Sequence, residues 1–121
     1  MKAEIRDAWA DALESGEYEQ GIGSLTSVVN GKEQHCCLGV LCQLAVKAGV
    51  IPEPEGSPTG ARLLYGKEGE NSFLPLEVQE WAGAEERTWF NYNDELRGAD
   101  WLNDIAELRF PEIAALVRTQ L

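Results

Sequence analysis

The sequence has little of what a membrane span or a secretion signal requires. Its longest apolar run, residues 36–42, is far shorter than the roughly 20 apolar residues that cross a bilayer. The first eleven residues include Glu4, Asp7 and Asp11, so a basic start followed by a hydrophobic stretch is missing. These features predict a cytoplasmic protein that does not bind membranes.

Basic residues are also scarce, with 10 Lys and Arg against 21 Asp and Glu and a net charge of -11. Binding to phosphate backbones normally needs clustered Lys and Arg, so we expect no direct nucleic-acid binding. The charge leaves three roles open, namely solubility, attraction to a basic partner, and imitation of DNA. A DNA mimic needs carboxylates at phosphate-like spacing on one face, whereas the later Glu and Asp residues occur as scattered pairs.

Histidine and cysteine, the residues that suit a soft metal or a Cys/His catalytic pair, are few: His35, Cys36, Cys37 and Cys42. Structural zinc favours two pairs of ligands, and the second pair is missing, so we predict no metal and no cofactor. The thiols are expected to be reduced and to pack in the core. A helix start can lower the pKa of a thiol such as Cys37, which keeps a cysteine-dependent enzyme as an alternative. His35, the one available base, should project away from Cys36 in a strand, so we predict no catalytic residues.

What is present describes one globular domain, residues 1–121. Hydrophobic residues make up 44% of the chain and charged residues 26%, enough apolar content for a core without disulfides. Ile5, Trp9 and Leu13 lie on one stripe of a helix over about residues 2–15, which Gly16 ends. An apolar helix over about residues 38–48 must be central. Three further helical patterns occupy residues 75–82, 101–105 and 110–121.

The clearest strand signal is Asn30-Gly31, flanked by residues 24–29 and 33–37. This pair favours the positive φ angles of a tight turn, so we predict an antiparallel β-hairpin over about residues 24–37. Residues 51–60 are rich in Pro and Gly and are predicted to be a loop. Residues 62–65 and 71–74 are a candidate second ribbon. The expected fold is α+β, mainly α, with four or five helices around the central one.

Several blocks of the sequence resemble a family of short proteins encoded by tailed phages and prophages, and the resemblance covers most of the chain. The first block comprises Trp9, Ala12, Leu13, Ser15, Gly16, Tyr18, Gln20, Gly21, Gly23 and Leu25. The second is the continuous run Cys36 to Cys42. Weaker blocks contain Leu74, Pro75, Val78, Trp81, Ala82 and Gly83, then Leu102, Asn103 and Asp104, and finally Phe110, Ile113 and Ala114. The chain departs from the pattern at Ala106, where the family usually has glycine.

The resemblance implies a phage context, in which the protein acts in the host cytoplasm, but it supplies no mechanism. Small phage proteins often block a host factor or sequester a defence signal, so an anti-defence role is one expectation. Our leading hypothesis is a non-catalytic binding protein whose partner is a host protein or a small nucleotide-like ligand. Dimerisation is open, because the chain is small and has several apolar helices.

The residues that we expect to bind a ligand come from two segments and one motif. Residues 88–94 mix aromatic rings with asparagine amides, a combination that suits a binding surface, although such rings equally pack in cores. Exposure of Trp81, Trp89 or Trp101 around a pocket would distinguish these possibilities. The predicted ligand-binding residues are Tyr18, Gln20, Gly21, Gly23, Trp89, Phe90, Asn91, Tyr92, Asn103 and Asp104.

Overall fold

The computed structural model describes residues 1–121, and its fold is α+β and mainly α, as the sequence predicts. Six short strands form three antiparallel two-stranded sheets beside the helices. The helices are α1 (Ala3–Glu14), α2 (Cys37–Lys47), α3 (Leu76–Ala82), α4 (Ala99–Asp104) and α5 (Phe110–Gln120). The strands are β1 (Thr26–Val29), β2 (Lys32–His35), β3 (Glu55–Gly56), β4 (Leu63–Leu64), β5 (Trp89–Tyr92) and β6 (Glu95–Gly98).

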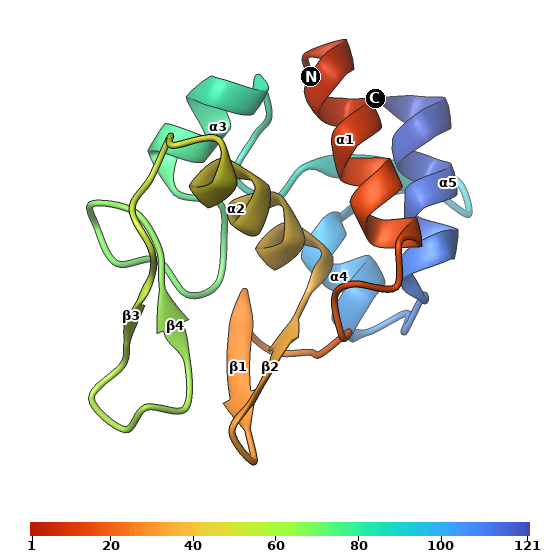
Figure 1. The fold of residues 1–121 in the computed structure, drawn as a ribbon. Coiled ribbons are helices and arrows are strands. Elements are labelled where there is room, and N and C mark those ends of the chain that lie inside the picture. Colours follow the sequence, from red (N-terminus) through yellow and green to blue (C-terminus); the bar gives the residue numbers. More distant parts are fainter.

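Helix α2 is the centre of the core, as predicted, and it begins one residue earlier than expected. It contacts α1, α3 and α4, and Figure 1 shows it between α3 and the α1–α5 pair. All residues from Cys36 to Cys42 are buried. At Gly39 the helix meets the chain just before β1 so closely that an added Cβ would lie 1.8 Å from the Leu25 carbonyl oxygen. Glycine at this position therefore allows the helix to reach the sheet.

Helices α1 and α5 pack side by side, and the two termini lie at the same end of this pair (Figure 1). Trp9 and Leu13 of α1 and Ile113 and Val117 of α5 are buried, each contributing roughly 1.5–3 kcal/mol of hydrophobic stabilisation. The indole N–H of Trp9 donates to the carbonyl oxygen of Cys37 over 2.9 Å. This bond also fixes α1 to the first turn of α2.

The predicted hairpin is confirmed as β1–β2. Its turn residues Asn30 and Gly31 have φ angles of 51° and 77°, as the type I′ turn of a two-residue hairpin requires. Both outer edges are covered by other backbone. The N–H of Gly21 donates to the carbonyl of His35, and the N–H of Val28 donates to the carbonyl of Ala61, each over 2.8 Å.

The predicted ribbon between residues 62–65 and 71–74 is wrong. Strand β4 pairs instead with β3, which lies inside the segment predicted to be only loop, residues 51–60. Asn71, in the second half of the expected ribbon, instead bonds the segment just before β1: its carbonyl accepts from the N–H of Leu25 over 2.8 Å. Residues 66–69 form a turn, and a single bridge between Tyr65 and Glu70 closes it.

A third hairpin, β5–β6, overlaps the segment that the sequence indicated only as a binding surface, residues 88–94. Its turn residues Asn93 and Asp94 have φ angles of 51° and 65°, so it is again a two-residue turn with two left-handed residues. The turn lacks the glycine that signalled the first hairpin, and β6 runs directly into α4 at Ala99.

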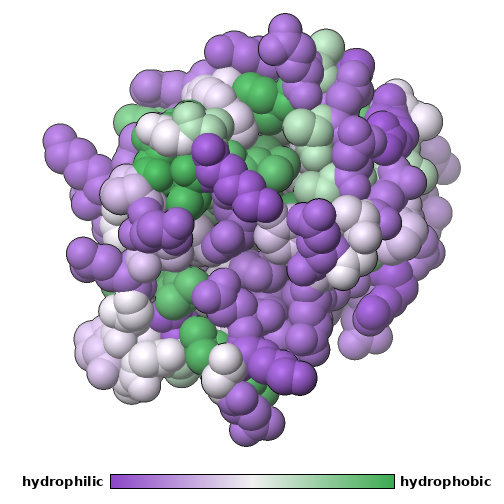
Figure 2. All heavy atoms as spheres, viewed as in Figure 1, coloured by the Kyte–Doolittle hydropathy of each residue, from purple (hydrophilic) through white to green (hydrophobic).

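The surface is mostly polar. Hydrophilic residues dominate the face drawn in Figure 2, and hydrophobic residues gather on it mainly over α2 and α3. None of the helices combines the length and apolar character needed to cross a membrane. The large hydrophobic side chains with substantial exposure are few and lie on different elements: Ile22, Val29, Leu76, Trp89, Leu96 and Ile105.

Candidate functional site

The three thiols lie inside the core, as predicted. Cys36 is 3% exposed, and Cys37 and Cys42 are fully buried. Burial raises the pKa of Cys36 to about 12, and burial followed by the neighbouring Cys36 raises the pKa of Cys37 and of Cys42 well above its usual value. Desolvation thus outweighs the start of α2, which alone would favour a thiolate. The sulfur atoms are therefore protonated and out of reach of a substrate.

His35 belongs to a buried chain of hydrogen bonds. Its Nδ1 lies 2.7 Å from Thr26 Oγ1, which in turn lies 2.7 Å from Tyr65 Oη. The Gln43 amide N–H donates to Tyr65 Oη over 2.6 Å. Because that nitrogen cannot accept a hydrogen bond, the Tyr65 hydroxyl donates to Thr26 Oγ1, and the Thr26 hydroxyl donates to His35 Nδ1. His35 Nδ1 is then the acceptor, and the neutral ring carries its proton on Nε2. Burial lowers the pKa of His35, consistent with a structural imidazole.

No three His, Cys, Asp or Glu side chains form a group that could hold a metal ion. The most voluminous hollow, about 340 Å³, instead lies between β3, β4 and the turn after β4. Three carboxylates line it against one ammonium group, so it disfavours phosphate-bearing ligands. Its charged lining residues are Glu53, Glu55, Glu68 and Lys67.

Part of the predicted ligand-binding set does come together, at the junction of the α1–β1 loop with α4. The side-chain N–H groups of Gln20 donate to Asn103 Oδ1 over 2.9 Å and to the Leu108 carbonyl over 2.8 Å. Its Oε1 accepts from the N–H of Phe110 over 3.1 Å. Gln20 therefore joins the loop before β1 to both ends of the α4–α5 connection.

Asn103 completes this clamp, and it is 1% exposed. Its Oδ1 also accepts from the N–H of Cys37 over 3.2 Å. Its Nδ2 donates to the carbonyl of Gly21 and to Asp104 Oδ1, each over 2.8 Å. Both lone-pair positions and both N–H groups of the amide are thus occupied, which leaves none for a ligand. We call this set the Gln20–Asn103 clamp.

Asp104 stands at the edge of the clamp and is half-buried. Burial raises the pKa of its carboxyl group, while hydrogen bonds from Asn103 and from the backbone of Gly23 act in the opposite direction. The predicted residues Gln20, Gly21, Gly23, Asn103 and Asp104 are therefore neighbours, but they bind one another.

Two shallow hollows flank the clamp and share Gln20 and Arg109. One, of about 260 Å³, is lined in part by Tyr18, and the other, of about 330 Å³, by Ile22 and Glu107. Ile22 is 61% exposed. Sequence reasoning missed Ile22, Glu107 and Arg109, because nothing in their local pattern separates them from ordinary loop residues.

Tyr18 packs against His35 and takes no part in the hydrogen bonds of the clamp. Its ring meets the His35 ring edge-on, with centroids 5.4 Å apart, and the Lys47 ammonium lies 5.4 Å from the Tyr18 centroid. The Tyr18 hydroxyl is buried and has no hydrogen-bond partner. Tyr18 thus covers the buried histidine from the outside.

The other predicted segment, residues 89–92, forms β5, away from the clamp. Its side chains alternate between the two faces of the strand. Phe90 is 1% exposed and anchors the hairpin, and the half-buried Tyr92 packs near Trp101 with centroids 6.3 Å apart. The backbone N–H and carbonyl of Asn91 bond the side-chain amide of Gln120, each over 2.8 Å. The hairpin is therefore fixed to the core by Phe90 and to α5 by this paired contact.

Trp89 is the exposed tryptophan of this protein, at 38%, whereas Trp9 is buried and Trp81 and Trp101 are half-buried. It borders a hollow of about 140 Å³ at the end of the molecule where the termini meet. The other lining residues are Met1, Gly83, Ala84, Glu85, Thr88 and Leu121.

Residues around Trp89 that the sequence did not single out complete this surface. The Arg87 guanidinium carbon lies 4.5 Å from the Phe73 ring centroid and 5.9 Å from that of Trp89, so the cation holds two rings. Leu96, opposite Asn91 in the hairpin, shares the face of Trp89 and is 67% exposed. A predicted hairpin with its turn at Asn93-Asp94 would have paired Leu96 with Asn91 and so placed Leu96 on the same face as Trp89. We call Arg87, Trp89 and Leu96 with the hollow the Trp89 face.

Backbone strain marks the same place. Thr88 has a φ angle of 56°, which is rare for a β-branched residue and costs on the order of 1–3 kcal/mol. It is 3% exposed, and its hydroxyl donates to the Glu85 carbonyl over 3.0 Å. Strain of this kind clusters at ligand clamps and other functional sites, and Thr88 directly precedes Trp89.

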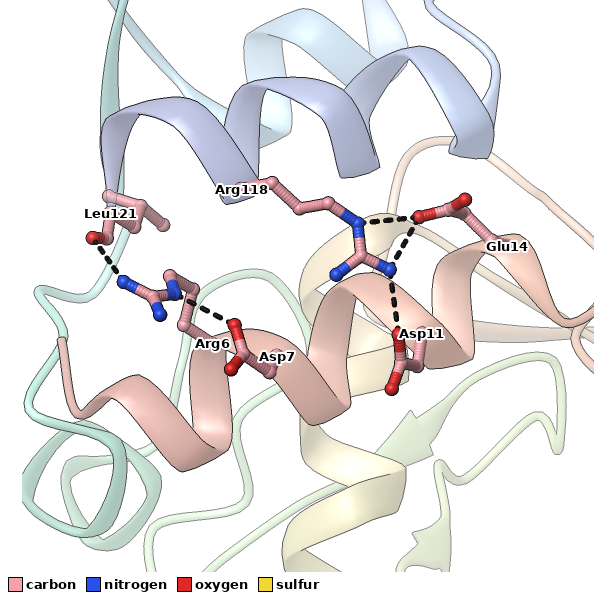
Figure 3. Close-up of polar contacts among 6 residues, drawn as sticks. All are labelled: Arg6, Asp7, Asp11, Glu14, Arg118 and Leu121. Carbon is pink, nitrogen blue, oxygen red and sulfur yellow. Dashed lines mark hydrogen bonds and ion pairs between the residues drawn. The ribbon is translucent and has the colours of Figure 1, made fainter.

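Three carboxylates of α1 are paired with arginines, as Figure 3 shows. Arg118 of α5 reaches Asp11 over 2.6 Å and Glu14 over 2.7 Å, and Arg6 contacts Asp7 over 2.9 Å. This face has mixed charge, unlike the array of uncompensated carboxylates that imitation of DNA requires.

Comparisons with known proteins give a family and no functional relative. No curated protein and no solved structure matches the chain. One family model, described as a domain of unknown function, DUF8296, matches residues 1–121. Because the match spans the whole chain, the protein belongs to the DUF8296 family.

Proposed function

We propose that this chain is a non-catalytic binding protein that recognises another protein through the Trp89 face. The observation that carries the proposal is a partly exposed tryptophan beside a hollow, on a hairpin that is fixed from two sides. Tryptophan and arginine are the residue types most enriched at the energetic centres of protein interfaces. Trp89 and Arg87 supply both within one cation–π contact.

Preorganisation supports the same role. The hairpin cannot shift easily, because Phe90 is buried below it and Gln120 holds the outer edge of β5. The contact with Arg87 further restricts the Trp89 ring. An interface side chain that is ordered before binding loses little conformational entropy on binding, so more of its contact energy appears as affinity.

The size of the hollow favours a protein over a nucleotide-like ligand. Pockets for small molecules usually have volumes of about 300–1,000 Å³, whereas the hollow beside Trp89 has about 140 Å³. That volume suits one side chain of a partner. Glu85 in its lining would also repel a phosphate group.

The three thiols and the one imidazole of the chain are unavailable to a substrate, which supports a non-catalytic role. The thiols are buried and protonated, and the imidazole of His35 is committed to Thr26. A cysteine-dependent enzyme is the weaker alternative for this reason. A DNA mimic is disfavoured at the outer face of α1, where Arg118 pairs with Asp11 and Glu14. That the partner is a host protein in the cytoplasm, and that the role is a phage accessory or anti-defence one, rests on the motif resemblance.

The test uses the Trp89→Ala variant with Ile22→Ala as its matched control. Ile22 is an exposed apolar residue at the Gln20–Asn103 clamp. Each immobilised protein would be exposed to lysate of cells that carry its gene, and any retained protein would then be purified and titrated by calorimetry. We expect Trp89→Ala to weaken its binding by about 30-fold or more, equivalent to roughly 2 kcal/mol, and Ile22→Ala to leave it unchanged.

Two results would contradict the proposal. If Ile22→Ala abolishes binding and Trp89→Ala does not, the partner docks at the clamp. If the purified protein instead turns over a substrate and retains no protein, the non-catalytic assignment is wrong.

A further inference from the structure

We infer that two copies of this chain associate through antiparallel pairing of their β6 strands, with Leu96 of one copy opposite Leu96 of the other. This inference does not require the proposed partner binding, although Leu96 belongs to both surfaces. It rests on the hydrogen-bond pattern of the β5–β6 hairpin and on the sequence of β6.

The outer edge of β6 carries unpaired backbone groups. Residues of an antiparallel pair alternate between bonding their partner strand and pointing their N–H and C=O groups outward. Asn91 points outward, because both of its backbone groups bond Gln120. Leu96, its partner in the register, must therefore point outward from the opposite edge, where its N–H and C=O groups have no partner.

The other strand edges of the fold are protected. Backbone bonds from Gly21 and to Ala61 cover the two edges of the β1–β2 hairpin, and the Gln120 amide covers β5. Strand β3 has only two residues, and Pro54 and Pro58 flank it. Proteins normally shield edges in these ways because an open edge accepts another strand. Strand β6 leaves its outer edge open at Leu96, whereas Gly98 at its end is buried.

The sequence of β6 is complementary to itself when read in the opposite direction. If Leu96 faces Leu96 of a second copy, Glu95 faces Arg97 of that copy, and Arg97 faces its Glu95. Within one copy Arg97 contacts Glu95 of its own strand and stacks on Trp101, 4.2 Å from the ring centroid, so the cross-strand pairs would share these charges. Opposite charges directly across antiparallel strands stabilise the pairing and favour this register. Such a contact uses the same patch on both copies, as a two-fold symmetric dimer requires.

Pairing would also remove apolar surface from water. Leu96 is 67% exposed in the single copy and would lie beside its counterpart on the same face of a four-stranded sheet. Trp89 shares this face through the register of the hairpin. The dimer would therefore present two Trp89 side chains on one surface. Each copy carries a charge of -11, so the local Glu95–Arg97 pairs must outweigh a general repulsion.

The experiment is sedimentation equilibrium of the full chain up to about 1 mM, where even a weak interface is occupied. We expect a monomer–dimer equilibrium. Leu96→Pro deletes the outward N–H, a change that edge strands tolerate, and should give a monomer with an unchanged circular dichroism spectrum. Leu96→Ala keeps both backbone bonds and should still dimerise, although more weakly.

Charge exchange tests the register. Glu95→Arg and Arg97→Glu should each weaken self-association by about tenfold or more, because each places like charges opposite one another. Mixed in equal amounts, the two variants should form a heterodimer, since every cross-strand pair is then opposite in sign. The inference is overturned if the wild-type chain is monomeric at about 1 mM or if Leu96→Pro dimerises like the wild type. It is also overturned if an equal mixture of the Glu95→Arg and Arg97→Glu variants associates no more strongly than either variant alone. In the monomeric case the open edge is free for a strand of a different protein.

Discussion

Replacing Asn103 with alanine tests whether the Gln20–Asn103 clamp is structural. The substitution removes four hydrogen bonds from a side chain that is 1% exposed. It leaves the N–H of Cys37 and the carbonyl of Gly21 without their partners. An unsatisfied buried backbone group costs about 1–3 kcal/mol, so the two groups together cost about 2–6 kcal/mol.

The lower half of that range is expected. Asn103 lines one of the flanking hollows, so a water molecule can enter the space and satisfy part of the exposed groups. We therefore expect the free energy of unfolding to fall by about 2–4 kcal/mol, a large part of the 5–15 kcal/mol typical of a domain. For a chain of this length the melting temperature should fall by about 8–16 °C.

The assay is urea unfolding followed by circular dichroism and tryptophan fluorescence, with Asn91→Ala as the control. Asn91 is exposed, and only its backbone bonds Gln120, so its replacement should change stability by no more than about 0.5 kcal/mol. A loss below about 1 kcal/mol for Asn103→Ala, with an unchanged urea dependence, would refute the clamp. Asn103 would then be available to a ligand, as the sequence predicts.

Three further predictions concern the core. Gly39→Ala should prevent folding or leave the protein insoluble, because its Cβ would lie 1.8 Å from the Leu25 carbonyl oxygen. The control Gly56→Ala should behave as the wild type in a comparison of solubility and thermal melting, because no atom lies within 4 Å of its Cβ. The pKa of His35 is lowered in the folded state, so below about 6.5 the unfolded chain binds more protons and the free energy of unfolding falls as pH decreases. Urea titrations at about pH 7 and pH 5.5 should show this loss in the wild type and a smaller one in His35→Gln. The three thiols should react with a disulfide reagent slowly in the native protein and rapidly in urea, and fast reaction of a native thiol would instead support a cysteine-dependent enzyme.

The sequence by itself determined the elements whose signals are local. The stripe of Ile5, Trp9 and Leu13 predicts α1 because a helix places every third or fourth residue on one side. Asn30-Gly31 predicts the first hairpin because this pair adopts positive φ angles at low cost. The apolar run from Cys36 to Cys42 likewise predicts a buried central helix and buried thiols, since nothing on it could face water.

Only the tertiary structure decided which segments pair and which side chains face inward. Strand β4 pairs with β3, while Asn71 bonds Leu25 at the start of the first hairpin and Leu74 bonds Glu86. The amides of Gln20 and Asn103 have the same chemistry for a ligand as for a backbone carbonyl, so their sequence predicts a polar site without saying what fills it.

The same limit applies to the aromatic residues. The sequence does not distinguish the neighbouring aromatic residues Trp89 and Phe90. In the structure, β5 exposes Trp89 beside a hollow and buries Phe90 in the core. Because side chains of a strand alternate between its faces, exposure depends on which face the helices cover. That choice is made by packing among segments far apart in the chain, and no short stretch of sequence contains it.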